Sequence, residues 1–153
     1  MKHVGGLATI PARQETLRKV VDSIIPQLDE LIIVCNGFSI PQWLYRKQYD
    51  KCFAVSREDN RGDAEKFIFA DNSRNSIYYT LDDDIIYPPT YCTYLEAGLL
   101  RYGGVVGLHG RTYPRPVTGF LKWKDNYRCL RYLEEDVMVD LIGTGCMAFY
   151  TNQ

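Results

Sequence analysis

Three consecutive carboxylates, Asp82, Asp83 and Asp84, follow an apolar run at residues 77–81 whose side chains favour a β-strand. Like charges at the mouth of a buried strand cost free energy unless a cation or a set of hydrogen-bond donors offsets them. Mg²⁺ and Mn²⁺ take oxygen ligands and leave coordination positions for substrate phosphates. The triplet therefore indicates a divalent-cation site. The alternative is a solvated turn whose last acid caps the next helix.

The elements that must position these acids alternate along the chain. Helical periodicity of apolar residues predicts a helix that buries Leu17 to Leu28, a second helix that starts at Asp63, and a third after Pro88 and Pro89. A short helix is also expected over residues 41–49. Compact apolar runs between the helices predict strands over residues 3–8, 31–35, 52–55, 77–81 and 105–108.

This alternation predicts a single α/β domain over residues 1–153, with a mostly parallel central sheet flanked by helices. Ligands bind beyond the carboxyl ends of the strands in such sheets. Polar candidates gather at these predicted ends, and they are Thr9, Arg13, Asn36, the loop at residues 60–63, the acid triplet and His109. The alternative for His109 is a structural role at the end of a strand. The paired Gly5 and Gly6 predict a close backbone or ligand approach to the first strand.

After His109 the chain becomes basic and aromatic, with Arg111, Tyr113, Arg115, Lys122, Trp123, Lys124, Tyr127, Arg128 and Arg131. Such a segment can neutralise phosphates or stack a ring, but we favour a solvated β-hairpin whose cations balance the acids at 134–136. A strand is expected over residues 137–142, broken at residues 143–145 and resumed over residues 146–150. These make a smaller β element near the C-terminus.

Composition narrows the class of protein. The net charge of −1 disfavours nucleic acid as a partner, and no apolar run is long enough for a membrane span. Five widely spaced cysteines without a Cys-x-x-Cys pair predict free thiols in a reducing compartment, so we expect a cytoplasmic protein. The same spacing argues against a zinc site.

Five segments, taken together, resemble the nucleotide-sugar glycosyltransferases of the GT-A type, and in particular family 2. They are residues 8–13 (ATIPAR), 32–37 (IIVCNG), 60–67 (NRGDAEKF), 80–89 (TLDDDIIYPP) and 140–149 (DLIGTGCMAF). The fourth resembles the Asp-x-Asp motif, and the fifth its Gly-Thr-Gly strand. The chain length is similar to that of compact glycosyltransferase domains from large viruses, which would place the protein in the host cytoplasm.

The resemblance implies a Rossmann-like GT-A fold, in which residues 1–108 bind the nucleotide and residues 109–153 form an incomplete sugar and acceptor side. Asp84 would bind Mn²⁺ or Mg²⁺, while Asp82 would contact the ribose or order the metal through water. Asp83 would lie near the sugar. The other implied donor contacts are Thr9, Pro11 and Arg13 beside the nucleoside, Asn36 and Asp63 at the base and ribose, Lys66 at the base or diphosphate, and Gly143, Thr144 and Gly145 at the sugar.

The implied reaction transfers a sugar, with inversion, from a UDP-sugar such as UDP-glucose to a glycan or other hydroxyl acceptor. The family's catalytic base and a late histidine follow the Gly-Thr-Gly strand, but only residues 151–153 follow it here. We therefore expect a base that is absent or replaced. Asp140 and Asp136 are the nearest acids, and for Asp140 we prefer a structural role. A truncated chain, completion by a further C-terminal segment or domain, and a nucleotide-sugar-binding protein with weak activity all stay open.

Two other classes are weaker interpretations. A sugar-nucleotide pyrophosphorylase needs a Gly-rich first loop with an essential Arg and Lys, which residues 9–13 do not supply. A nucleic-acid-binding module would use the basic segment, and its salt-dependent binding would survive chelation of metal.

Overall fold

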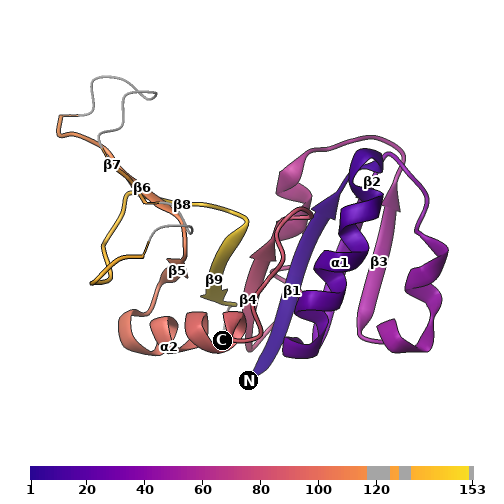
Figure 1. The fold of residues 1–153 in the computed structure, drawn as a ribbon, viewed down its shortest axis with the longest axis horizontal. Helices are drawn as coiled ribbons and strands as arrows, with labels where there is room; N and C mark the ends of the chain where they lie inside the picture. Colours follow the sequence, from indigo (N-terminus) through magenta and orange to yellow (C-terminus); the bar gives the residue numbers. More distant parts are fainter. Residues whose placement is uncertain (117–124, 128–131, 152–153) are drawn as a thin grey trace.

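The computed structural model describes residues 1–116, 125–127 and 132–151. Its centre is a six-stranded sheet in the order β3-β2-β1-β4-β9-β5 (Figure 1). The strands are β1 (Lys2–Thr9), β2 (Glu30–Asn36), β3 (Cys52–Arg57), β4 (Ser76–Leu81), β5 (Val105–Gly107) and β9 (Cys146–Tyr150). Strands β1 to β4 pair in parallel, and β9 runs antiparallel to both of its neighbours. The predicted α/β class with a mostly parallel sheet is confirmed.

The strand order reverses at β1. The chain moves outward from β1 to β2 and β3, and then returns to place β4 on the other side of β1. The carboxyl ends of β1 and β4 therefore lie side by side at a topological switch point, with Leu7 in register with Leu81. Such switch points are where open α/β sheets bind ligands.

Helix α1 (Gln14–Ile24) follows β1 through the short 3₁₀ helix η1 (Pro11–Arg13) and ends in η2 (Ile25–Gln27). Its buried residues, Leu17, Val20, Val21 and Ile24, have the predicted spacing of one helix face. They join a core that includes Leu7 of β1, the alternate β2 residues Leu31, Ile33 and Cys35, and α2 (Tyr91–Tyr102). Helices thus cover one face of the sheet.

The opposite face is covered differently. Val4, Ile32 and Tyr78 form a small cluster there, packed by Phe69, Ala70 and Phe149. The predicted helix from Asp63 is wrong in type, because residues 63–67 form the 3₁₀ helix η5 (Asp63–Phe67) and turns follow it. Asp63 is its first residue and does not cap it.

Gly6 explains how η5 approaches the sheet so closely. A Cβ atom at Gly6 would lie 2.1 Å from the Lys66 carbonyl oxygen and 2.2 Å from the Tyr78 hydroxyl. That hydroxyl donates a hydrogen bond to the same carbonyl. The predicted close approach at the paired glycines is confirmed, and the approaching group is backbone of the same chain.

A second sheet of three strands, in the order β7-β6-β8, extends away from the main sheet (Figure 1). It contains β6 (Gly110–Thr112), β7 (Asp125–Tyr127) and β8 (Leu141–Ile142). The antiparallel pairing of β6 with β7 confirms the predicted hairpin. Much of the basic segment lies outside the described residues, including Lys122, Trp123, Lys124, Arg128 and Arg131.

Two predictions about the C-terminal strands are wrong. The strand expected over residues 137–142 is reduced to β8. The strand expected over residues 146–150 is confirmed as β9, but it does not continue β8 and instead joins the main sheet between β4 and β5. The expected helix over residues 41–49 is two 3₁₀ helices, η3 (Gln42–Tyr45) and η4 (Lys47–Tyr49). No helix in the described ranges is long and apolar enough to cross a membrane.

Candidate functional site

The acid triplet lies directly beyond the end of β4, at the switch point beside β1. Because β9 starts next to the end of β4, with Leu81 in register with Cys146, the turn at residues 143–145 reaches the same edge. The sheet therefore brings together Thr9, the triplet and Gly145. These residues are far apart in the sequence, and all were predicted to belong to one site.

Asp82 points into the protein and pairs with Lys66. The Lys66 side chain is fully buried (0% exposed), and its Nζ contacts an oxygen of Asp82 and lies 2.7 Å from Asp63 Oδ1. Burial of an ammonium group is tolerated because two carboxylates offset the cost of desolvation. The predicted contact of Lys66 with base or diphosphate is untested, but in this conformation its amine is committed to these two acids.

Gly145 packs directly against Asp82. A Cβ atom at Gly145 would lie 1.9 Å from Asp82 Oδ2, so a side chain there would displace the carboxylate. The neighbouring Thr144 hydroxyl donates to Asp63 Oδ2 over 3.1 Å. The Gly-Thr-Gly turn is thereby joined to both acids that hold Lys66.

Tyr87 is a residue of this site that the sequence analysis missed. Its buried hydroxyl accepts a hydrogen bond from the Asp82 backbone N–H (2.8 Å) and donates one to the Gly145 carbonyl (2.6 Å). The residue thus fixes the triplet to the start of β9. The sequence signal was weak, because an aromatic residue between a polar turn and two prolines is also typical of ordinary core packing.

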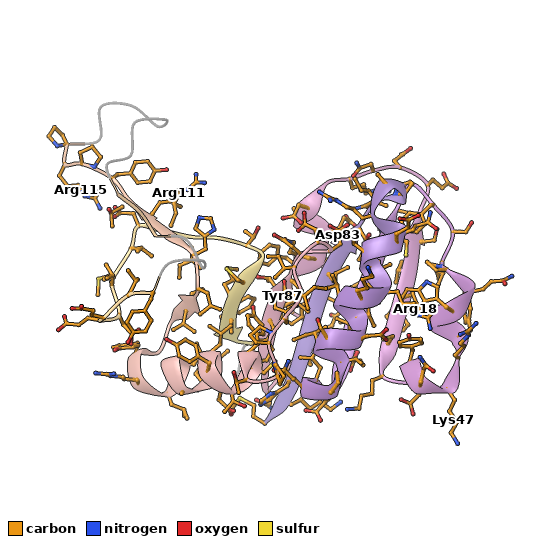
Figure 2. All side chains as sticks on the ribbon, viewed as in Figure 1. Arg18, Lys47, Asp83, Tyr87, Arg111 and Arg115 are labelled. Carbon is orange, nitrogen blue, oxygen red and sulfur yellow. The ribbon has the colours of Figure 1, made fainter. Side chains whose placement is uncertain are left out.

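Asp83 lies half-buried beside β1, near the N-terminal end of α1 (Figure 2). Burial raises the pKa of its carboxyl above the ordinary value, and the charge of Asp84 adds to the rise. The Thr9 hydroxyl, Arg13 and the Ile10 backbone N–H partly oppose it. Thr9 is 1% exposed, and its Oγ1 has no hydrogen-bond partner of normal geometry among the described residues.

Asp84 is the most accessible acid of the triplet, with its side chain 42% exposed. Its Oδ2 lies 3.0 Å from Nη2 of Arg13, and the Arg13 Nε lies 4.0 Å from Asp83 Oδ1. The Thr16 hydroxyl lies within hydrogen-bond distance of the backbone carbonyls of Arg13 and Asp83. It fixes the backbone of the two segments against each other.

Asn36 occupies the carboxyl end of β2 and is buried. Its amide nitrogen donates to the Gly62 carbonyl over 3.1 Å, and its Oδ1 accepts a weak bond from the Arg61 N–H at 3.5 Å. It therefore fixes the loop that precedes η5. Pro11 begins η1 beside this edge and is exposed.

Gly143 and Asp140 lie further from the triplet along the chain. A Cβ atom at Gly143 would meet the His109 side chain at 3.1 Å, and the Gly143 N–H donates to the His109 carbonyl. The Asp140 carboxylate pairs with Arg115 and accepts the Tyr113 backbone N–H at 2.8 Å. Arg111 lies in β6 and Arg115 follows that strand, and both lie away from Asp83 (Figure 2). Asp140 thus has the structural contacts that we preferred for it.

No protein-family model matches this chain, and no curated protein matches it either. The site must be interpreted from its own geometry. Among the described residues, no group of three or more His, Cys, Asp or Glu side chains is arranged to hold a metal ion. This does not argue against Mg²⁺ or Mn²⁺, because such ions commonly use one or two protein carboxylates together with water and substrate phosphates.

Proposed function

We propose that the chain is a metal-dependent glycosyltransferase of the GT-A type that takes its sugar from a UDP-sugar and transfers it to an acceptor hydroxyl with inversion. One observation carries the proposal. Asp83 and Asp84 lie at the switch point of a mostly parallel sheet, and Asp83 lies beside the buried hydroxyl of Thr9. A polar edge of this kind is where α/β folds bind nucleotides.

The residues present fit a divalent cation. Asp84 offers a half-exposed carboxylate, and Asp83 offers a second whose burial is costly without a positive partner. Bound Mn²⁺ or Mg²⁺ would stabilise the charge that develops on the departing diphosphate. Asp82 is paired with Lys66, and its effect on the metal would therefore be indirect.

The remaining contacts support the donor orientation expected from the resemblance. Thr9, Pro11 and Asn36 lie at the ends of β1 and β2, where a nucleoside would approach. Gly145 is buried and lets the turn pack against Asp82, which holds the start of β9 beside the triplet. Asp63 and Thr144 connect these two regions.

A second candidate function is nucleotide-sugar binding without efficient transfer. It is favoured by the contacts of Asp140, because Arg115 and the Tyr113 N–H hold one carboxylate oxygen each and so give the residue a structural role beside β6. The two functions differ in one measurement. A transferase releases UDP from UDP-glucose in the presence of acceptor, whereas a binding protein does not.

The thermal stability of the protein tests the donor site. We expect saturating Mn²⁺ with UDP-glucose to raise the melting temperature, because ligands that bind the folded state stabilise it by mass action. Asp84→Asn should lose most of the metal-dependent part. Asp71→Asn is a matched control, since Asp71 is an exposed acid before the amino end of β4. If neither UDP nor UDP-glucose shifts the melting temperature with saturating metal, the proposal is wrong.

A further inference from the structure

Arg13 places a positive charge at the acids that would hold the metal. Its Nη2 lies 3.0 Å from Asp84 Oδ2, and its Nε lies 4.0 Å from Asp83 Oδ1. The residue ends η1, directly beyond β1, so its position is fixed by the fold. The guanidinium is a positive group that partly offsets the charge of these two carboxylates in the folded chain.

We propose that Arg13 is an internal counterion that competes with the divalent metal for Asp83 and Asp84. Metal binding displaces the guanidinium from the acids, and the released side chain pairs with the diphosphate of the donor. This inference rests on the proposed function and adds to it an order of events and a competition.

The competition follows from the geometry of Asp84. A divalent ion would lie about 2.1 Å from a coordinating carboxylate oxygen. Arg13 already places a positive nitrogen beside one oxygen of that group, so the two cations would repel each other at close range. The repulsion is strongest if both cations use Asp84 Oδ2, and a movement of the arginine relieves it.

A second, independent observation points to a ligand at the same place. The Thr9 side chain is almost completely buried, and its hydroxyl has no hydrogen-bond partner of normal geometry in the described ranges. Thr9 is the last residue of β1, next to the end of β4 from which the triplet follows. Buried polar groups without partners are rare in folded proteins, and a bound metal–diphosphate group would supply one.

The arginine is free to move although its backbone is not. The backbone is held by the bond from the Arg13 N–H to the Ile10 carbonyl and by the Thr16 hydroxyl. The Arg13 side chain is 45% exposed. Half-exposed ion pairs contribute little stability, so displacement of the guanidinium has a low cost.

Metal and diphosphate binding should therefore be coupled. The metal releases Arg13, which then forms charge-assisted hydrogen bonds to phosphate oxygens. If the metal raises the affinity for a nucleotide that binds the released arginine, linkage requires the nucleotide to raise the affinity for the metal by the same factor. Mn²⁺ alone should bind weakly, and Mn²⁺ with UDP should bind cooperatively.

The test is a titration of the full chain with Mn²⁺ by calorimetry, first without nucleotide and then with UDP. Arg13→Gln should bind Mn²⁺ alone about fivefold more tightly, because the competing ion pair is gone. The same variant should bind UDP in saturating Mn²⁺ roughly tenfold more weakly, because a charge-assisted contact is lost.

Arg18→Gln is the matched control, because it removes the same charge from an exposed position further along α1 (Figure 2). It should change neither affinity by more than about twofold. If Arg13→Gln leaves the Mn²⁺ affinity equal to that of the wild type, the competition is wrong and the donor site survives. If neither protein binds Mn²⁺ with or without UDP, the proposed function is wrong and the inference falls with it.

Discussion

The three neighbouring aspartates of the triplet have three different environments. Asp82 faces a fully buried lysine, Asp83 is half-buried beside Thr9, and Asp84 is exposed to solvent next to Arg13. The triplet was visible in the sequence as a site, but this division was not. It depends on Lys66 and Gly145, which approach Asp82 only through the pairing of β4 with its neighbours.

Gly145→Ala tests whether the contact with Asp82 matters. The new methyl group would lie 1.9 Å from Asp82 Oδ2, so either the turn or the carboxylate must move. We expect a loss of about 1–3 kcal/mol in the free energy of unfolding, as for other overpacked sites. Urea denaturation measures it. The metal-dependent rise in melting temperature should also shrink, and an unchanged stability would contradict the described contact.

At the scale of elements, the strands of the main sheet were predicted well, because each is a compact apolar run between polar turns. Strand β2 covers the predicted residues 31–35 with one more residue at each end, and β4 covers residues 77–81 with one more residue at its start. The helix predicted from Asp63 failed for a reason that lies elsewhere in the chain. Gly6 lets the backbone of this segment approach β1, and the Tyr78 hydroxyl binds its Lys66 carbonyl. The spacing of apolar residues within one segment does not show such a contact with a distant part of the chain.

The prediction that the two C-terminal segments form one interrupted strand is wrong for a similar reason. Residues 137–142 and 146–150 are separated by three residues with two glycines, which is typical of one interrupted strand. In the structure they pair with different sheets, because Ile142 is in register with Gly110 of β6 and Cys146 with Leu81 of β4. The sequence of a single segment does not show which distant strand that segment will pair with.

Gly98 offers a prediction about helix α2. The residue lies in the interior of the helix, and a Cβ atom there would meet Val106 at an ordinary contact distance of 3.6 Å. Gly98→Ala should therefore raise the free energy of unfolding by about 0.5–1 kcal/mol, because alanine has the higher helix propensity. A rise in the urea midpoint with an unchanged slope measures this gain. A lower midpoint would mean that α2 packs more tightly against β5 than described.

At the scale of the whole molecule, the interior contains many weak acids in neutral form. Burial raises the pKa of Cys35 from 9.0 to about 11, and burial with nearby acids raises those of Cys52 and Cys92 to about 12. Burial likewise raises the pKa of Tyr78, Tyr79, Tyr87 and Tyr91 above the ordinary value. The predicted free thiols are confirmed for Cys35, Cys52 and Cys92, and Cys129 lies outside the described residues.

These groups predict a loss of stability in alkali. Below about pH 7.5 they are protonated in both states, so their contribution to stability is constant. Above it the unfolded chain releases protons that the folded chain retains, and the free energy of unfolding falls as the pH rises. Each group that ionises only on unfolding contributes a slope of about 1.4 kcal/mol per pH unit. The urea midpoint should therefore decrease steeply from about pH 9 to about pH 11, with tyrosinate absorbance appearing at the same transition.

Tyr91→Phe isolates one of these contributions. The Tyr91 hydroxyl is buried and has no hydrogen-bond partner in the part of the chain that the structure describes, so its removal should not lower stability at neutral pH. In alkali the variant should lose stability less steeply than the wild type, because one ionisable group is gone from the unfolded chain. Tyr45→Phe is the matched control, because the Tyr45 side chain is exposed in the folded protein. Equal slopes for wild type and Tyr91→Phe would show that Tyr91 titrates freely, which would contradict the packing of α2 against the sheet.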